Sequence, residues 1–170
     1  MSTLSAGPIG ELSALLSYPK AGFRDRFESA LKSLTVAAPA AAAALEPFAA
    51  FVAASSDTEL EEAFTQTFDL NPACALEIGW HLYGEEYKRG EFLVEMRRLM
   101  RRLGVPEDTE LPDHLSHVLA VLPLMEREPA RELTTQKVLP ALAKIRKAAA
   151  NHPYDGVLRA IEVFLEGEKS

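Results

Sequence analysis

The segment that decides the fold class is residues 92–104, which read FLVEMRRLMRRLG. Its apolar residues recur every three or four positions and therefore share one face of a helix, with four arginines beside them. Gly104 and Pro106 come at its end, and both are residues that stop helices. The segment predicts an amphipathic α-helix that buries one face in a core.

Similar periodicity recurs through the rest of the chain. Pro8 fits the first turn of a short helix, and Phe23 and Phe27 lie one turn apart in a second. Ser56 and Glu59 have the spacing of a capping box at the start of another helix. Apolar residues at helical spacing also occur in segments 60–68, 76–83, 115–122, 138–145 and 157–165. We expect an all-α fold, a single compact bundle of about eight or nine helices that forms one domain over residues 1–170.

The Ala-rich segment 36–54 is long enough to be mistaken for a membrane span, because Glu46 is its only charged residue. Pro39 and Pro47 interrupt it, however, and alanine is only weakly apolar. Its larger apolar residues fall on one face of a helix. We therefore expect one core helix here, and no stable insertion in a membrane.

The composition and charge limit the kinds of partner. The chain is 48% hydrophobic and 25% charged, as in ordinary globular proteins, and its net charge is −7. Such a surface repels nucleic acid and anionic lipids, and suits a basic or neutral partner. The lone Cys74 cannot form an internal disulfide, and residues 1–10 lack the pattern of a signal peptide. We expect a reducing compartment and no nucleic-acid binding.

Motifs for catalysis are scarce. The sequence contains no G-x-S-x-G, no Walker A and no G-x-G-x-x-G pattern. His114 and His117 lie three residues apart on a predicted helix and could share a metal, although zinc sites need three or four ligands. A small metal-dependent hydrolase that uses these histidines is therefore one alternative, and a generic helical adaptor is another. We expect a binding protein with no catalytic residues, no metal and no cofactor of its own.

Four short motifs follow one another in an order that a known family shares. They read Phe64-Thr-Gln-Thr-Phe68-Asp69, Cys74-Ala-Leu76, Arg89-Gly90-Glu91-x-Leu93 and Glu110-Leu-Pro112-Asp113-His114-Leu115. With the opening Leu15-Leu16-Ser17-Tyr18-Pro19 they resemble the nitrate reductase delta-subunit (NarJ-type) assembly chaperones of molybdoenzymes. This family belongs to the TorD/DmsD superfamily of redox-enzyme maturation chaperones.

The resemblance implies a cytoplasmic, all-helical chaperone that is not an enzyme. Its partner would be the N-terminal peptide of a molybdenum-containing catalytic subunit, with a nitrate reductase as the first candidate. The chaperone would hold that peptide while the molybdenum cofactor is inserted. We expect it to be a monomer or a weak dimer.

The resemblance also suggests where the peptide binds, since the stretch from Glu110 to His114 matches the motif tied to function in the family. Asp113 is expected to pair with a basic residue of the peptide, and His114 to make binding sensitive to pH. An alternative is that Asp113 caps a helix that begins at Pro112. Aromatic residues near helix-breaking positions complete the expected site, which comprises Asp113, His114, Leu115, Glu110, Trp80, Tyr83, Phe68 and Asp69.

Overall fold

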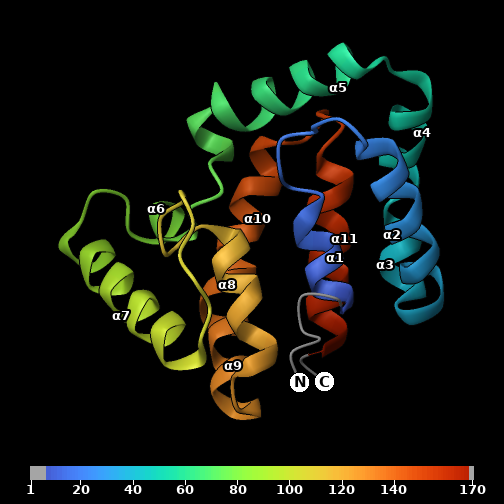
Figure 1. Ribbon diagram of the computed structural model, residues 1–170. Coiled ribbons are helices and arrows are strands. Elements are labelled where there is room, and N and C mark those ends of the chain that lie inside the picture. The colour runs from blue at the N-terminus through green and yellow to red at the C-terminus, as the bar shows by residue number, and fades with distance from the viewer. Residues whose placement is uncertain (1–6, 169–170) are drawn as a thin grey trace.

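The computed structural model describes residues 7–168, and this part of the chain is an all-α bundle without β-strands, as predicted. Figure 1 shows the arrangement of its helices. The α-helices are α1 (Pro8–Ala14), α2 (Phe23–Ala37), α3 (Pro39–Ala44), α4 (Glu46–Ala54), α5 (Asp57–Phe64), α6 (Ile78–Tyr83), α7 (Tyr87–Leu103), α8 (Leu115–Val121), α9 (Arg127–Leu133), α10 (Leu139–Ala148) and α11 (Asp155–Glu168). Short π-helical turns are η2 (Thr65–Asp69) and η5 (Thr134–Val138), and short 3-10 turns are η3 (Pro72–Cys74) and η4 (Leu122–Leu124).

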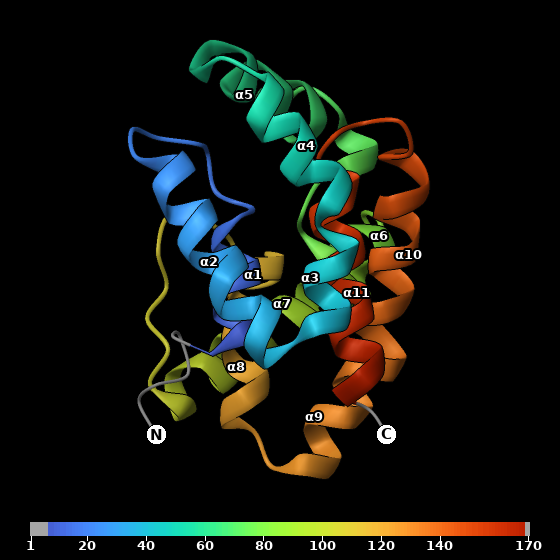
Figure 2. The same ribbon diagram turned by 90° about the vertical axis from the view of Figure 1, so that its right-hand side faces the viewer.

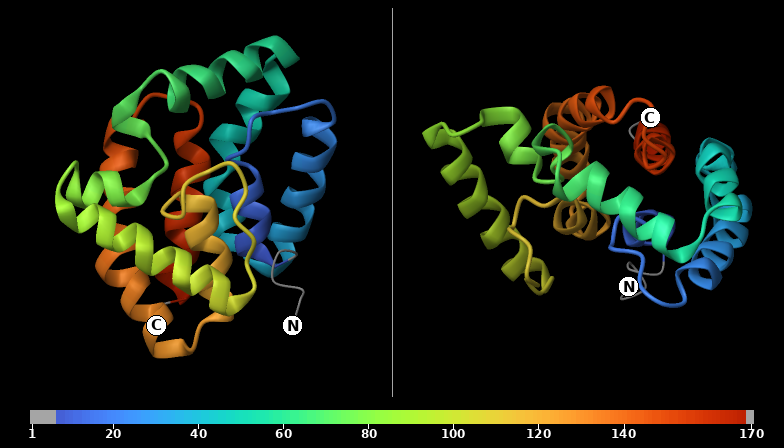
Figure 3. Two further views of the ribbon diagram at one scale, coloured as in Figure 1. Left: turned by 60° about the vertical axis from the view of Figure 1, so that its left-hand side comes forward. Right: turned by 90° about the horizontal axis from the view of Figure 1, so that it is seen from above.

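The closing helix α11 lies in the middle of the bundle. It packs against α1, α3, α4 and α10, and Figure 2 shows α2, α3, α11 and α10 side by side. On the other flank α6 packs against both α7 and α10, while α8 packs against α1 and α7. Figure 3 shows α5 crossing the top of this arrangement and α7 at its outer edge. Buried apolar side chains from Ile9 in α1 to Leu165 in α11 form one hydrophobic cluster.

Helix α7 confirms the prediction made from residues 92–104, and begins five residues earlier, at Tyr87. Its buried side chains are Phe92, Met96 and Met100, one from each successive turn. Gly104 ends the helix with φ 75°, a left-handed conformation that costs glycine little.

The Ala-rich segment forms two helices instead of the single one expected. Helix α3 ends before Leu45, and α4 starts with Pro47 in its first turn, where a missing N–H costs nothing. Leu45 and Phe48 are fully buried at this junction. Among the described helices none is both long enough and apolar enough to cross a membrane.

Helix α5 begins with the predicted capping box. The Glu59 N–H donates to Ser56 Oγ at 3.1 Å, and the Ser56 N–H donates to Glu59 Oε1 at 2.8 Å. The helix then widens into the π-helical turn η2, which carries Phe68 and Asp69.

An aromatic cluster fixes η2 to the rest of the bundle. The ring of Tyr154, which lies just before α11, is within 4.9 Å of Phe48, 5.5 Å of Phe64 and 5.3 Å of Phe68, centroid to centroid. Tyr154 is fully buried. The position of Phe68 therefore depends on packing between α4, α5 and the start of α11.

Candidate peptide-binding groove

A groove of about 520 Å³ opens where three parts of the chain meet: the end of α1 with the loop after it, the end of α5 with η2, and the loop that leads into α8. We call it the acidic groove. Its lining residues are Ser13, Leu16, Ser17, Tyr18, Lys20, Phe64, Phe68, Asp69, Ala75, Leu76, Glu77, Asp108, Thr109, Glu110, His114 and Ser116. Four of these side chains are acidic and one is a lysine, while the larger apolar and aromatic ones come mainly from the loop after α1, the end of α5 and η2.

A short backbone bridge joins two of the predicted motifs on one side of the groove. Glu77 and His114 form an antiparallel β-bridge, the only one among residues 7–168. The Ile78 N–H donates to the Asp113 carbonyl at 2.9 Å, and the Leu115 N–H donates to the Leu76 carbonyl at 2.8 Å. The bridge thus places Glu77 directly beside His114.

His114 is the N-cap of α8. Its Nδ1 accepts the Ser116 N–H at 3.1 Å and lies 2.8 Å from Ser116 Oγ. Because Nδ1 is an acceptor, the proton of the neutral imidazole is on Nε2, which lies 3.9 Å from Glu110 Oε1. Burial lowers the pKa of His114, although Glu110 and Glu77 act in the opposite direction. The groove therefore presents a neutral imidazole N–H beside two carboxylates at neutral pH.

Asp113, expected from the sequence to pair with a basic residue of the peptide, does not line the acidic groove. Its side chain is fully buried and accepts from Arg89, with Nε 3.1 Å from Oδ2 and Nη2 3.5 Å from Oδ1. The alternative that Asp113 caps a helix is also wrong, because α8 begins at Leu115 with His114 as the cap. Asp113 lies in the turn just before His114, and its side chain faces the core, whereas His114 lines the groove.

Leu115, Trp80 and Tyr83 are also absent from the lining of the acidic groove. Leu115 is fully buried, and Tyr83 packs against other residues of the bundle. The Tyr83 hydroxyl lies 2.5 Å from Lys137 Nζ, and its ring lies 6.0 Å from that of Phe92. Of the eight predicted residues, the groove brings together Phe68, Asp69, Glu110 and His114.

Sequence reasoning missed several residues of the groove. Glu77 and Asp108 contribute acidic groups, and Tyr18 contributes an aromatic ring that packs edge-on against Phe64 at 5.8 Å. Tyr18 lies in the opening motif, and Glu77 directly follows the motif that ends at Leu76. Their position in or beside those motifs was the one sequence signal that could have identified them as groove residues. The sequence does not show, however, that the motifs meet in the folded chain.

The two histidines of the hydrolase alternative have different partners. His117 Nδ1 lies 2.8 Å from the Leu111 carbonyl, and its Nε2 lies 3.0 Å from Asp108 Oδ1. Both of its nitrogens are therefore engaged away from His114. Donor atoms of Glu77, Glu110 and His114 do lie within 4.8 Å of one another, a spacing that a metal ion could bridge. The capping role of His114 opposes this, because it keeps the proton on the nitrogen that faces Glu110.

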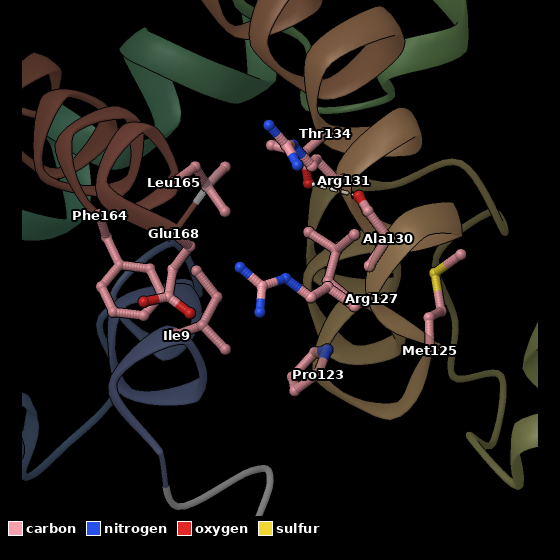
Figure 4. Close-up of a pocket in the computed structure, with 11 residues that line it drawn as sticks. Ile9, Pro123, Met125, Arg127, Ala130, Arg131, Thr134, Phe164, Leu165 and Glu168 are labelled. Atoms are coloured by element: carbon pink, nitrogen blue, oxygen red, sulfur yellow. Dashed lines mark hydrogen bonds between the residues drawn. The ribbon is translucent and has the colours of Figure 1, made fainter. Parts of the chain in front are cut away.

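A second cavity lies at the other end of α1. It has a volume of about 200 Å³ and lies between α1, α9 and α11. Figure 4 shows apolar side chains on its walls, among them Ile9 and Phe164, with the Arg127 guanidinium pointing inward. Its lining contains none of the residues of the predicted motifs. The acidic groove is therefore the better candidate site.

The described part of the chain is an all-helical bundle with a surface groove that combines carboxylates and aromatic rings. The family model of the nitrate reductase delta subunit matches residues 35–154, and the chain belongs to this family. A search of curated proteins gave no match. Family membership implies an assembly chaperone for a molybdoenzyme.

Proposed function

We propose that the acidic groove binds the N-terminal segment of the catalytic subunit of a molybdenum-containing reductase, with a nitrate reductase as the first candidate. The chaperone would hold this segment in the cytoplasm while the molybdenum cofactor is inserted. The observation that supports this proposal is the meeting of four of the five motifs around one groove, which combines an apolar wall with acidic side chains.

The chemistry of the groove favours an amphipathic and basic segment. Its apolar side chains would pack on the wall formed by Leu16, Phe64 and Phe68, of which the two phenylalanines are anchored by Tyr154. Its lysine or arginine would lie against the carboxylates of Glu77 and Glu110. The net charge of −7 would speed the approach of such a segment.

Calorimetric titration with a synthetic peptide of the client's N-terminus tests the proposal. The double variant Asp69→Asn/Glu110→Gln removes two groove charges and should weaken binding by about tenfold, with a shallower salt dependence. The matched control Glu91→Gln/Glu95→Gln removes the same charge from the exposed face of α7 and should bind as the wild type does. Equal affinity of the two double variants would overturn the proposal.

Two further measurements distinguish the proposed chaperone from a generic adaptor and from a metal-dependent hydrolase. A generic adaptor would bind a scrambled peptide of the same composition as tightly as the client sequence, whereas a specific chaperone would not. A metal-dependent function would require the ion, so chelation with EDTA would abolish it. We expect EDTA to leave peptide affinity unchanged.

A further inference from the structure

The buried Arg89–Asp113 pair has a cost that stability alone does not explain. The Asp113 carboxylate is fully buried, while the Arg89 side chain keeps 23% of its exposure. Removing a carboxylate from water is expensive, and well-packed apolar residues often replace such pairs without loss of stability. The position of the Arg89–Asp113 pair therefore calls for a functional explanation.

The backbone around this carboxylate carries the groove. The carbonyl of Asp113 accepts the Ile78 N–H, and the next residue, His114, forms the β-bridge with Glu77. The Asp113 carboxylate thus holds the bridged backbone from the core side. On the other side of this backbone, Glu77 and His114 line the groove.

Three elements converge on this one side chain. Arg89 comes from α7 and Gly79 from α6, while Asp113 lies in the loop before α8. A β-carbon at Gly79 would overlap with Asp113 Oδ2, so the carboxylate occupies the space that glycine leaves open. Gly79 and Arg89 therefore fix where Asp113 lies, one by shape and the other by charge.

We propose that Gly79, Arg89 and Asp113 form a positioning unit that sets the spacing between Glu77, Glu110 and His114 in the acidic groove. None of the three lines the groove, so none is expected to touch the peptide. The unit determines affinity for the basic group of the bound segment through the residues that it places. This inference rests on the proposed function of the groove.

Variants of two residues of the unit test the proposal by independent routes. Asp113→Asn removes the charge, while Gly79→Ala keeps every charge and displaces the carboxylate by its added methyl group. Each should weaken binding of the client peptide at least fivefold. The double variant should bind the peptide as tightly as the single variant with the lower affinity does, since both substitutions act through one unit. Arg131→Met, which breaks the exposed Arg131–Glu128 pair on α9, away from the acidic groove, should leave binding unchanged.

A second readout does not depend on the peptide. The NMR signals of the His114 imidazole in the free protein should shift, and its titration midpoint should move, in Gly79→Ala and Asp113→Asn but not in Arg131→Met. The groups that face His114 are Glu77, Asp108, Glu110 and His117. If the positioning unit only stabilised the fold, its variants would leave the distances from His114 to these groups unchanged.

The outcomes separate the two proposals. Variants that melt at lower temperature but keep wild-type affinity and an unchanged His114 spectrum would overturn the positioning role. If Asp113→Asn does not fold, Gly79→Ala and Arg89→Met provide the same comparison, with the same two results expected. Failure of the wild type to bind any client peptide would overturn the proposed function, while the His114 spectrum would still decide whether the unit positions the groove.

Discussion

His114 connects the start of α8 with the chemistry of the acidic groove. Its imidazole accepts the Ser116 N–H as a helix cap and presents the opposite nitrogen to Glu110. Asparagine at this position would keep a capping acceptor but would not titrate. The variant His114→Asn therefore separates the two roles of this residue.

Stability should depend on pH through His114. Burial lowers its pKa below the ordinary histidine value of 6.5, so the unfolded chain binds the proton more tightly than the folded chain does. The free energy of unfolding should therefore fall as the pH drops from 7 through 6.5 and below. Urea denaturation at a series of pH values should give a shallower fall in His114→Asn. An unchanged slope would show that His114 does not titrate as its surroundings indicate.

His81 contributes to the same pH range, which is why the slope in His114→Asn should be reduced and not abolished. Burial lowers the pKa of His81, whose Nε2 lies 2.6 Å from the Ala75 carbonyl. A double variant that also carries His81→Gln provides the control for this second contribution.

Tyr154 offers a test of the aromatic cluster behind the groove. Its hydroxyl is buried without a hydrogen-bond partner among the described residues, and burial raises its pKa. Tyr154→Phe removes the unpaired hydroxyl and keeps the ring, so it should raise the free energy of unfolding by about 1 kcal/mol. Tyr154→Ala should instead lower it by about 3–5 kcal/mol through the cavity that it leaves. A loss of stability in Tyr154→Phe, measured by thermal unfolding, would indicate a partner for the hydroxyl.

At the scale of single residues, the sequence identified Asp113 and His114 but not the directions in which they point. The direction of Asp113 depends on Arg89, which is 24 residues away, and on the missing side chain of Gly79. No local pattern encodes such a contact. The sequence likewise offers Asp113 as an alternative helix cap, because aspartate is a far commoner cap than histidine.

Two glycines of α7 provide a matched test at the scale of an element. Gly90 lies inside the helix with open space around it, whereas Gly104 ends the helix at φ 75°. Gly90→Ala should raise the free energy of unfolding by about 0.5–1 kcal/mol, because alanine loses less backbone entropy. Gly104→Ala should lower it by about 1 kcal/mol, because a β-carbon disfavours positive φ. Changes of the same sign in the two variants, measured by chemical denaturation, would contradict this account of the helix.

Elements with local signals could be predicted well. Helix α7 has its periodicity and its terminal glycine, and α5 has its capping box. The π-helical turn η2 and the late start of α8 were missed, because both depend on contacts between distant segments. The turn packs Phe68 against Tyr154, and the bridge between Glu77 and His114 delays the helix. The groove is made of these missed features, which is why its outline could not be predicted.

For the whole molecule, the prediction of a single domain can be tested by calorimetry. The buried apolar residues from Ile9 to Leu165 belong to one cluster, which favours one cooperative transition with equal calorimetric and van't Hoff enthalpies. Two resolved transitions would indicate two domains. The same samples, examined by analytical ultracentrifugation, would test the prediction of a monomer or a weak dimer.

The central claim is that the acidic groove holds the N-terminal segment of the catalytic subunit. The most direct measurement is photo-crosslinking in cells that express both proteins, with a photoreactive amino acid at Ser17 or Thr109 in the groove. The matched controls are Tyr87 and Val94 on the exposed face of α7. We predict crosslinks from Ser17 and Thr109 that map by mass spectrometry to the N-terminal segment of the catalytic subunit, and none from the controls. Crosslinks to that segment from Tyr87 or Val94, with none from the groove, would contradict the account.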